Sequence, residues 1–273
     1  MKPQHKTRII PNDVRGGEVI FSNVLASKEF PTIIEGRYEV RLAKNAKETA
    51  SALKLRYQVF SLELACEAPS PSGSILEFDA FDFKCRHLIV IDRFTGATVG
   101  TYRLNTLETA GSTRGFYSAE EFTIEDLPDQ ILQNGIEIGR ACIAKDHRNT
   151  KVLFLLWKAL LSYLIFTEKQ YFFGCCSIFT QDIETGSSAF NQLHGDGHMH
   201  EQFGVTPKHD GLSPDDTPGN ERIELPALFN MYLRIGAKVC GPPMIDREFG
   251  TIDFFVVFDV TKMNKKYRRM FAA

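Results

Sequence analysis

The chain has 273 residues, of which 43% are hydrophobic and 24% charged, enough to bury a sizeable core in a globular protein. Its formal net charge of −2 argues against a general nucleic-acid binder, so we expect no nucleic-acid partner. Residues 1–14 lack the apolar core of a signal peptide, which predicts a cytoplasmic protein.

The N-terminal third begins without regular structure and then becomes helical. Residues 1–34 show no sustained period and predict an extended arm, whereas residues 38–43 alternate and predict the first strand. From Asn45 the pattern is helical, and Arg56 and Phe60 would share one face of that helix. Spacing alone favours an Arg56 side chain that reaches out to water over one that points into a site. The apolar stripe of the helix comprises Leu53, Tyr57, Phe60 and Leu64.

Acidic residues precede a clear hairpin. Residues 68–74 predict a loop, after which Asp79 and Asp82 lie among phenylalanines. Such carboxylates need partners if they are buried, and a solvated acidic loop is the alternative. Residues 86–107 predict two apolar strands around a turn. Arg103 lies in the second strand, where a solvent-facing position is the default explanation.

The centre of the chain reads as strand, polar loop and buried helix. Residues 136–144 predict a buried strand, residues 151–168 a helix buried on most sides, and residues 171–179 a second buried strand. This order implies a right-handed crossover between two parallel strands. The helix N-terminus after the polar loop has N–H groups that would suit an anion.

Shorter elements surround this centre. A capping box formed by Ser118 and Glu121 predicts a short helix within residues 115–128. Further elements are predicted at 182–193 (helix), 225–236 (amphipathic helix closed by Gly236) and 251–260 (strand).

Histidine and cysteine do not form a recognisable metal motif. His194, His198 and His200 lie in the loop-like stretch 194–222, but no cysteine or carboxylate stands at a matching separation. We therefore expect no metal there, and instead a mobile loop at the entrance of a site. The six cysteines lack a Cys-x-x-Cys pair, which favours buried reduced thiols over disulfides or a zinc framework.

The end of the chain is basic. Residues 262–269 hold five lysines and arginines, which predicts either a solvated end or contact with an anionic surface. No internal repeat or linker interrupts the chain. We therefore expect one domain over residues 35–260, between the arm at 1–34 and a basic tail at 261–273.

Several separated motifs stand in a recognisable order along the chain: Arg56-x-x-x-Phe60, Asp79-x-x-Asp82, Arg103 and Glu137-Ile-Gly-Arg140. They resemble those of the GNAT-superfamily bacterial N-acyltransferases that acylate ornithine or other amino acids, and also those of acyl-homoserine-lactone synthases. The resemblance covers about residues 37–260. It implies an α/β, GNAT-like fold, in which a central mixed, twisted sheet with splayed central strands is flanked by helices.

The resemblance also implies a site. In the synthases the matching residues form an acidic and basic cluster beside the acyl-transfer cleft, and a structural ion-pair network is the alternative explanation. Catalytic roles are implied for Glu137, Arg140 and Arg103, with Glu137 as general base and the arginines binding the acceptor's carboxyl group. The implied substrate-binding residues are Arg56, Phe60, Asp79, Asp82, Cys142, Ile143, Arg148, Lys151 and Trp157.

The spacing of Glu137 and Arg140 requires a local irregularity. Residues three apart on a regular strand point to opposite faces, so Gly139 is expected to permit a bulge between Gly139 and Cys142. In GNAT folds the central strands splay near such a bulge. The N–H groups freed there would hold the donor's pantetheine arm and the oxyanion of the intermediate.

The loop before the buried helix bears on the acyl donor. GNAT acetyltransferases have a Gln/Arg-x-x-Gly-x-Gly/Ala pattern there, and its glycines let the backbone approach the coenzyme A pyrophosphate. When Arg148 is aligned with the first position of this pattern, Lys151 and Leu153 stand in place of the glycines. The resemblance therefore implies an acyl carrier protein as partner, its phosphopantetheine-linked acyl chain as substrate, and no resident cofactor. Residues Phe154, Trp157 and Leu161 would line an acyl tunnel or simply pack in the core.

Together these features predict an N-acyltransferase. The resemblance implies that it moves a long-chain fatty acyl group, with or without a 3-hydroxyl, from acyl carrier protein to the α-amine of an amino acid such as ornithine. A lipid product predicts peripheral contact with an anionic membrane at its inner face. One alternative is an acyl-homoserine-lactone synthase. Those synthases carry a tryptophan shortly after the phenylalanine that matches Phe60, and this chain has none there. Its absence argues against lactone formation and against S-adenosylmethionine as the acceptor. The other is a non-catalytic acyl-carrier or lipid-binding protein.

Overall fold

The computed structural model describes residues 29–64, 74–212 and 221–272. Its strands are β1 (Ile33–Glu35), β2 (Tyr38–Leu42), β3 (Arg86–Asp92), β4 (Thr98–Thr106), β5 (Gly135–Ile143), β6 (Tyr171–Ile178), β7 (Lys238–Val239), β8 (Met244–Asp246) and β9 (Thr251–Asp259). Its α-helices are α1 (Ala46–Arg56), α2 (Leu107–Ala110), α3 (Ser118–Glu121), α4 (Asp129–Gln133), α5 (Thr150–Phe166), α6 (Ile183–Gly195), α7 (Ala227–Ile235) and α8 (Lys265–Ala272).

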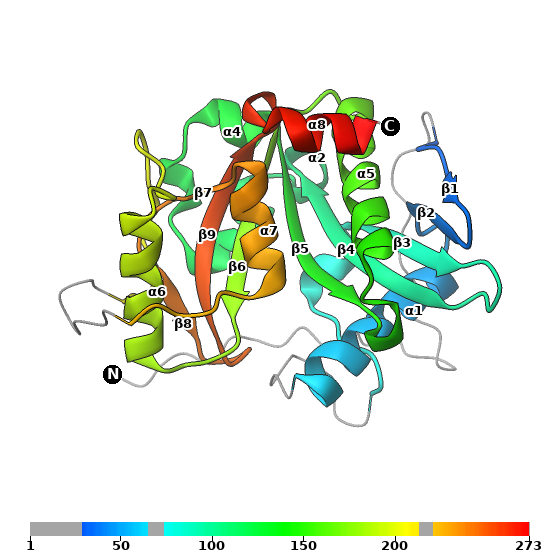
Figure 1. Ribbon diagram of the computed structural model, residues 1–273, viewed down its shortest axis with the longest axis horizontal. Helices are drawn as coiled ribbons and strands as arrows, with labels where there is room; N and C mark the ends of the chain where they lie inside the picture. The colour runs from blue at the N-terminus through cyan, green and yellow to red at the C-terminus, as the bar shows by residue number, and fades with distance from the viewer. Residues whose placement is uncertain (1–28, 65–73, 213–220, 273) are drawn as a thin grey trace.

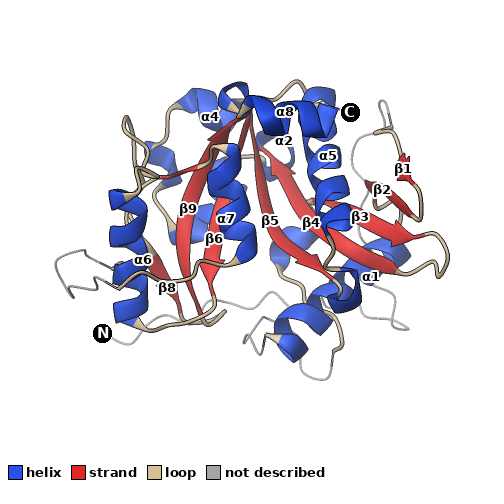
Figure 2. Ribbon diagram, in the orientation of Figure 1, coloured by secondary structure: helices blue, strands red, loops and turns tan. Residues whose placement is uncertain are grey.

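The strands form one mixed sheet in the order β1-β2-β3-β4-β5-β6-β9-β7, and β8 also pairs with β9 (Figures 1 and 2). Helices cover both faces of this sheet. In Figure 1, α5, α7 and α8 lie in front of it, whereas α1, α2 and α4 lie behind it. The predicted mixed sheet flanked by helices is confirmed, although β1 precedes the segment that we expected to be the first strand.

The parallel pair β5 and β6 divides the sheet. The two strands pair from Gly135 with Tyr171 to Glu137 with Phe173 and then diverge, as Figure 1 shows. Beyond that point β5 stays paired with β4 and β6 with β9. The facing edges of β5 and β6 therefore have no strand partner after Glu137, which is the predicted splay.

Gly174 occupies the point of divergence. Its φ is +152°, and a Cβ there would lie only 2.4 Å from the carbonyl oxygen of Ile138. Because any side chain would collide with the β5 backbone, this close approach of the two strands requires glycine.

The predicted bulge is present in β5. The register against β4 shifts by one residue between Gly139 and Cys142, so Arg140 and Ala141 face a single β4 residue. Arg140, with φ of 49°, adopts the left-handed conformation, at a cost of roughly 1–2 kcal/mol. The expectation that Gly139 provides this freedom is wrong. A Cβ at Gly139 would meet no atom within 4 Å.

Helix α1 begins as expected and ends in an unexpected π-helix. Asn45 Oδ1 accepts a hydrogen bond from Glu48 N and caps the first turn. The helix then widens into a π-helical segment, η1 (Tyr57–Glu63). A π-turn changes the angle between successive side chains, so the predicted apolar stripe does not continue: Phe60 is buried but Leu64 is exposed.

Helix α5 is buried along most of its length, as predicted. Most of the predicted basic tail, residues 261–273, forms helix α8. Phe271 of α8 is buried and packs against Phe154 and Trp157 of α5, while the lysines and arginines of α8 remain exposed. In the described part of the chain, no helix combines the length and the apolar character needed to cross a membrane.

The predicted capping box at Ser118 is wrong. Tyr117 occupies the N-cap position of α3 without a side-chain hydrogen bond, and Ser118 Oγ donates instead to Glu137 Oε1 at 2.8 Å. A tertiary acceptor thus replaces the local one that the sequence pattern indicated.

Residues 198–200, in the predicted mobile loop, are hydrogen-bonded to the sheet and do not form a free loop. His200 N donates to Val239 O and Val239 N donates to His198 O, so this segment borders β7. The described cysteines are free thiols, as predicted. Cys66, most of the predicted N-terminal arm and the predicted loop before Ser74 lie outside the described residues.

Candidate active site

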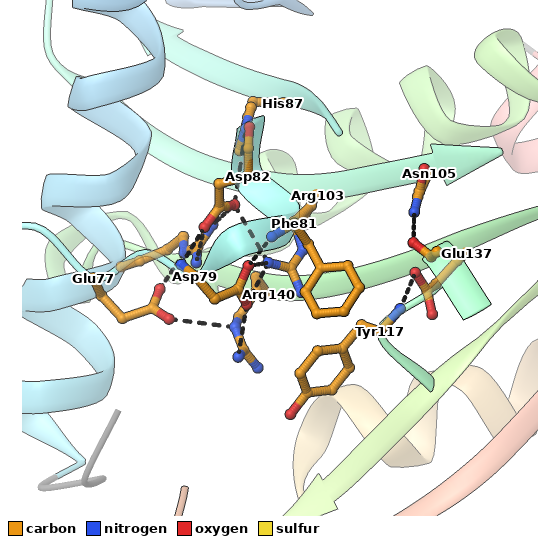
Figure 3. A network of polar contacts seen from close by, with 12 residues as sticks. Glu77, Asp79, Phe81, Asp82, His87, Arg103, Asn105, Tyr117, Glu137 and Arg140 are labelled. Atoms are coloured by element: carbon orange, nitrogen blue, oxygen red, sulfur yellow. Dashed lines mark hydrogen bonds and ion pairs between the residues drawn. The ribbon is translucent and has the colours of Figure 1, made fainter. Parts of the chain in front are cut away.

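Arg56, the last residue of α1, anchors a buried ion-pair network, whose other charged members are labelled in Figure 3. Its Nη1 and Nη2 donate to the two oxygens of Asp82 at 2.6 and 3.0 Å, and its Nε donates to Glu77. The Arg56 side chain is only 1% exposed, so the prediction that it reaches out to water is wrong. A buried guanidinium is tolerated here because both carboxylates are equally buried and match its donors.

Arg103 of β4 and Arg140 of β5 extend this network through Asp79. Arg103 Nη1 lies 2.6 Å from both oxygens of Asp79, and Arg140 Nη2 donates to Asp79 Oδ2 at 3.2 Å. Arg140 Nε lies 3.3 Å from Glu77 Oε1. Arg103 is buried, so its default solvent-facing position is also wrong, because helix α1 packs across β4.

The network is balanced in charge. Although burial opposes ionisation, the charges of Arg56 and Arg103 hold the pKa of Asp82 well below its ordinary value. Burial lowers the pKa of the neighbouring His87, which therefore adds no positive charge at neutral pH. Three arginines are thus matched by three carboxylates, and Arg56 is too deeply enclosed to contact an acceptor.

Glu137 lies apart from these ion pairs (Figure 3). Its Oε1 accepts hydrogen bonds from Ser118 N and Ser118 Oγ, both at 2.8 Å, and its Oε2 accepts one from Tyr117 N at 3.1 Å. Burial raises the pKa of Glu137, and these hydrogen bonds partly oppose that rise. A carboxylate oriented in this way, with a raised pKa, can accept a proton near neutral pH.

A cleft opens where the central strands diverge. The β5 wall runs over residues 138–141 and the β6 wall over residues 175–177, with α7 alongside. The cleft has an empty volume of about 870 Å³, including its open mouth. Four of the predicted site residues line it together: Phe60, Arg103, Glu137 and Arg140.

Other predicted residues have supporting or core positions. Cys142 is buried, and burial raises the pKa of its thiol to about 12, which leaves it unreactive at neutral pH. Ile143 packs against the main core. Trp157 lines a smaller apolar cavity next to the cleft, with an empty volume of about 280 Å³, whereas Phe154 and Leu161 pack against the core and line neither space.

The loop before α5 offers little to a pyrophosphate. Arg148 is paired with Glu63, and its Nε donates to Ile143 O at 3.1 Å. Asn149 Oδ1 accepts from the N–H groups of Lys151 and Val152, both at 3.1 Å. Two of the first N–H groups of α5 are therefore already satisfied, which weakens the expected anion site.

Sequence reasoning missed three residues that shape the site. Glu77 continues the alternation of Asp79 and could have been found from that pattern. Tyr117 and Ser118 carry no such signal, because their contacts with Glu137 join positions about twenty apart in sequence. The Tyr117 ring also lies 4.7 Å from the Arg140 guanidinium carbon and helps to enclose it.

Solved structures similar to the chain include FeeM, an N-acyl amino acid synthase from uncultured soil microbes. The two are 10% identical with a TM-score of 0.49, and the match covers 83% of this chain and 93% of FeeM. Another is BjaI, a CoA-dependent acyl-homoserine lactone synthase, at 12% identity with a TM-score of 0.47. That match covers 82% of this chain and 81% of BjaI.

Sequence comparisons are more specific. Residues 55–158 match the family described as "Acetyltransferase (GNAT) domain". The chain is 30% identical over 249 residues to L-ornithine N(alpha)-acyltransferase of Rhizobium meliloti, covering 86% of this chain and 84% of that protein. It is also 30% identical over 248 residues to the protein of the same name from Rhodobacter capsulatus, covering 86% of this chain and 94% of that protein. The chain therefore belongs to the GNAT superfamily and, within it, to the bacterial acyltransferase family that contains the L-ornithine N(alpha)-acyltransferases.

Proposed function

We propose that the chain transfers a long-chain fatty acyl group from a thioester to the α-amine of ornithine or a closely related amino acid. The name shared by the relatives supports transfer to ornithine. The observation that carries the proposal is the position of Glu137, whose oriented carboxylate lines the cleft at the point where β5 separates from β6.

The chemistry follows from this geometry. Glu137 accepts a proton from the acceptor's ammonium group, directly or through a water, and the resulting amine attacks the thioester carbon. A C–N bond forms, the C–S bond breaks, and the pantetheine thiol leaves with a proton. The β5 edge that lacks a strand partner offers N–H groups to the oxyanion. The proposed reaction needs no resident cofactor.

Arg140 is the arginine best placed to bind the acceptor's carboxylate. It lines the cleft, and its contacts with Glu77 and Asp79, at 3.3 and 3.2 Å, are longer than the 2.6 Å contact of Arg103 with Asp79. Arg103 and Arg56 are proposed to hold Arg140 indirectly, by fixing the carboxylates of Asp79 and Glu77 that contact it.

We propose acyl carrier protein as the donor. The loop before α5 supports this choice, since its arginine and helix N-terminus are already engaged and leave no open cradle for a pyrophosphate. Lys145 and Lys151 are exposed at this loop, next to the Arg148–Glu63 ion pair, and suit the acidic surface of a carrier protein. The proposed product leaves towards a membrane, to which the exposed cations of α8 would bind peripherally.

The deciding experiment incubates the protein with ornithine and either hexadecanoyl carrier protein or acetyl-coenzyme A, and measures kcat/KM by mass spectrometry. We expect N-acylornithine to form from the carrier-protein donor, with the acetyl donor far slower because each buried CH₂ contributes roughly 0.8 kcal/mol. Equal performance of acetyl-coenzyme A would refute the proposed donor. Lactone formation from S-adenosylmethionine would favour the synthase alternative, and binding without turnover would favour a carrier or lipid-binding protein.

A further inference from the structure

A second group of ionisable side chains lies on the β6 side of the cleft. It consists of Glu121 of α3, Cys175 of β6 and Asp253 of β9, and one side-chain atom of each lies within 4.8 Å of the others. Cys175 and Asp253 line the cleft. Glu121 and Asp253 are only 4% and 3% exposed. Asp253 therefore faces the cleft, and Glu121 is buried beside it, away from the outer surface.

The acidic pair has no counter-ion within the described residues. Neither oxygen of Glu121 nor Oδ1 of Asp253 makes a hydrogen bond of regular geometry to a described residue. The Cys175 thiol and the Tyr117 hydroxyl are the polar groups next to Glu121, and neither carries a positive charge. The cation whose charge acts on Asp253 is Arg140, which is already paired with Glu77 and Asp79. Burying two ionised carboxylates without a positive partner is strongly unfavourable, so the acidic pair must either retain a proton or bind a cation.

The pKa values of Asp253 and Glu121 are both raised, as expected for buried carboxylates that have no positive partner. Burial raises the pKa of Asp253 to about 6, and the Asp246 carboxylate contributes to the rise. Burial and the charge of Asp253 raise the pKa of Glu121 well above its ordinary value. The empty pair thus retains a proton at neutral pH, which an incoming ammonium group would replace.

Ser118 connects the acidic pair to the proposed base. Its Oγ lies 2.8 Å from Glu137 Oε1 and 3.6 Å from Cys175 Sγ. Cys175 in turn has its sulfur within 4.8 Å of an oxygen of Glu121 and of Asp253, so Ser118 and Cys175 form a line of contacts from Glu137 to the acidic pair. The side chain of an acceptor whose α-amine contacts Glu137 would extend along this line. Three methylene groups separate the two nitrogens of an extended diamino acid by roughly 6 Å, since each of the five bonds is about 1.5 Å long.

We propose that Glu121 and Asp253 bind the side-chain ammonium group of a diamino-acid acceptor and so select it over neutral amino acids. This inference rests on the proposed N-acyl transfer. An ammonium group has three donors, which match the carboxylate oxygens that lack partners. Arg140 would hold the acceptor's carboxylate at the opposite end, so the two charged ends of the amino acid fix its α-amine at Glu137.

The test compares ornithine with 2-aminopentanoate, which has the same carbon chain without the second amine. With one acyl carrier protein donor, we expect kcat/KM to favour ornithine on the order of 10- to 100-fold, the scale of a hydrogen bond to a charged group. Asp253→Asn and Glu121→Gln should each reduce this ratio towards one. General damage to the site would lower kcat/KM for both acceptors equally and would therefore leave their ratio unchanged.

Glu125→Gln is the matched control, because Glu125 lies near Glu121 but is exposed and pairs with Lys208. It should leave the ratio unchanged. A wild-type ratio near one, or an unchanged ratio in both acidic-pair variants, would overturn the inference while leaving the proposed transfer intact. One equivalent of metal in the purified wild type, lost in Asp253→Asn, would also overturn it in favour of a metal site. If neither amine is acylated, the proposed function fails and this inference with it.

Discussion

Replacing Glu137 by glutamine removes the proposed base while keeping the shape of its side chain. The amide oxygen can still accept from Ser118 N and Oγ, but the amide NH₂ then faces Tyr117 N, donor against donor. One hydrogen bond is lost at a cost of roughly 1 kcal/mol. A buried charge is removed at the same time, which offsets part of this loss. We therefore expect the variant to fold.

The loss in turnover should be much larger than the loss in stability. Removal of a general base lowers a rate by a factor on the order of 100 to 10,000. For a chain of this size, 1 kcal/mol corresponds to a Tm shift of about 2–4 °C. Single-turnover formation of acylornithine, calorimetric Tm and binding of a thioether donor analogue separate the two effects. Unchanged single-turnover rates in Glu137→Gln would remove Glu137 from the mechanism.

The pH dependence gives an independent check. Burial raises the pKa of Glu137, so the rising limb of kcat/KM that it controls lies above the ordinary carboxyl value of about 4.3. Ser118→Ala removes a hydrogen bond that stabilises the ionised form, and should move this limb to higher pH. A lower rate with the limb in place would indicate that Glu137 has only a structural role.

Three further predictions concern stability and membrane contact. Arg56→Gln leaves two buried carboxylates without their main partner and should lower stability by roughly 3–5 kcal/mol, measured by denaturant unfolding; a change below about 1 kcal/mol would contradict the buried network. Gly174→Ala should be strongly destabilised by the contact with Ile138 O, whereas Gly139→Ala, which meets no atom within 4 Å, should keep wild-type stability; equal unfolding curves would disprove the close approach. Neutralising the exposed cations of α8 should weaken sedimentation with phosphatidylserine vesicles by about 1 kcal/mol per charge, without changing Tm; identical sedimentation would exclude α8 as a membrane contact.

The sequence by itself determined the elements that frame the site. Periodicity located the hairpin of β3 and β4, the buried strand β5, helix α5 and the parallel strand β6, since each pattern reports local burial of apolar side chains. Gly236, with φ of 115°, closes α7 as predicted, because only glycine adopts this conformation readily. The family motifs also brought together four residues that line the cleft.

Only the tertiary structure decided which charges are buried and what they contact. Periodicity predicted that Arg56 and Arg103 face water, because it contains no information about carboxylates from distant parts of the chain that contact them in the fold. Their partners are 21 to 26 residues away, and the contact between Arg140 and Asp79 spans 61.

The same limit applies to the bulge and to the acidic pair. The sequence predicted the bulge in β5 but not which residue adopts the left-handed conformation. That residue is Arg140, whose side chain is held by contacts with Glu77 and Asp79. Glu121 lies close to Asp253 because its neighbours Ala119 and Phe122 belong to one core cluster with Phe255 of β9, and no sequence spacing relates the two carboxylates. A charge can be buried only with a partner that satisfies it, and that partner is chosen by how the strands and helices pack.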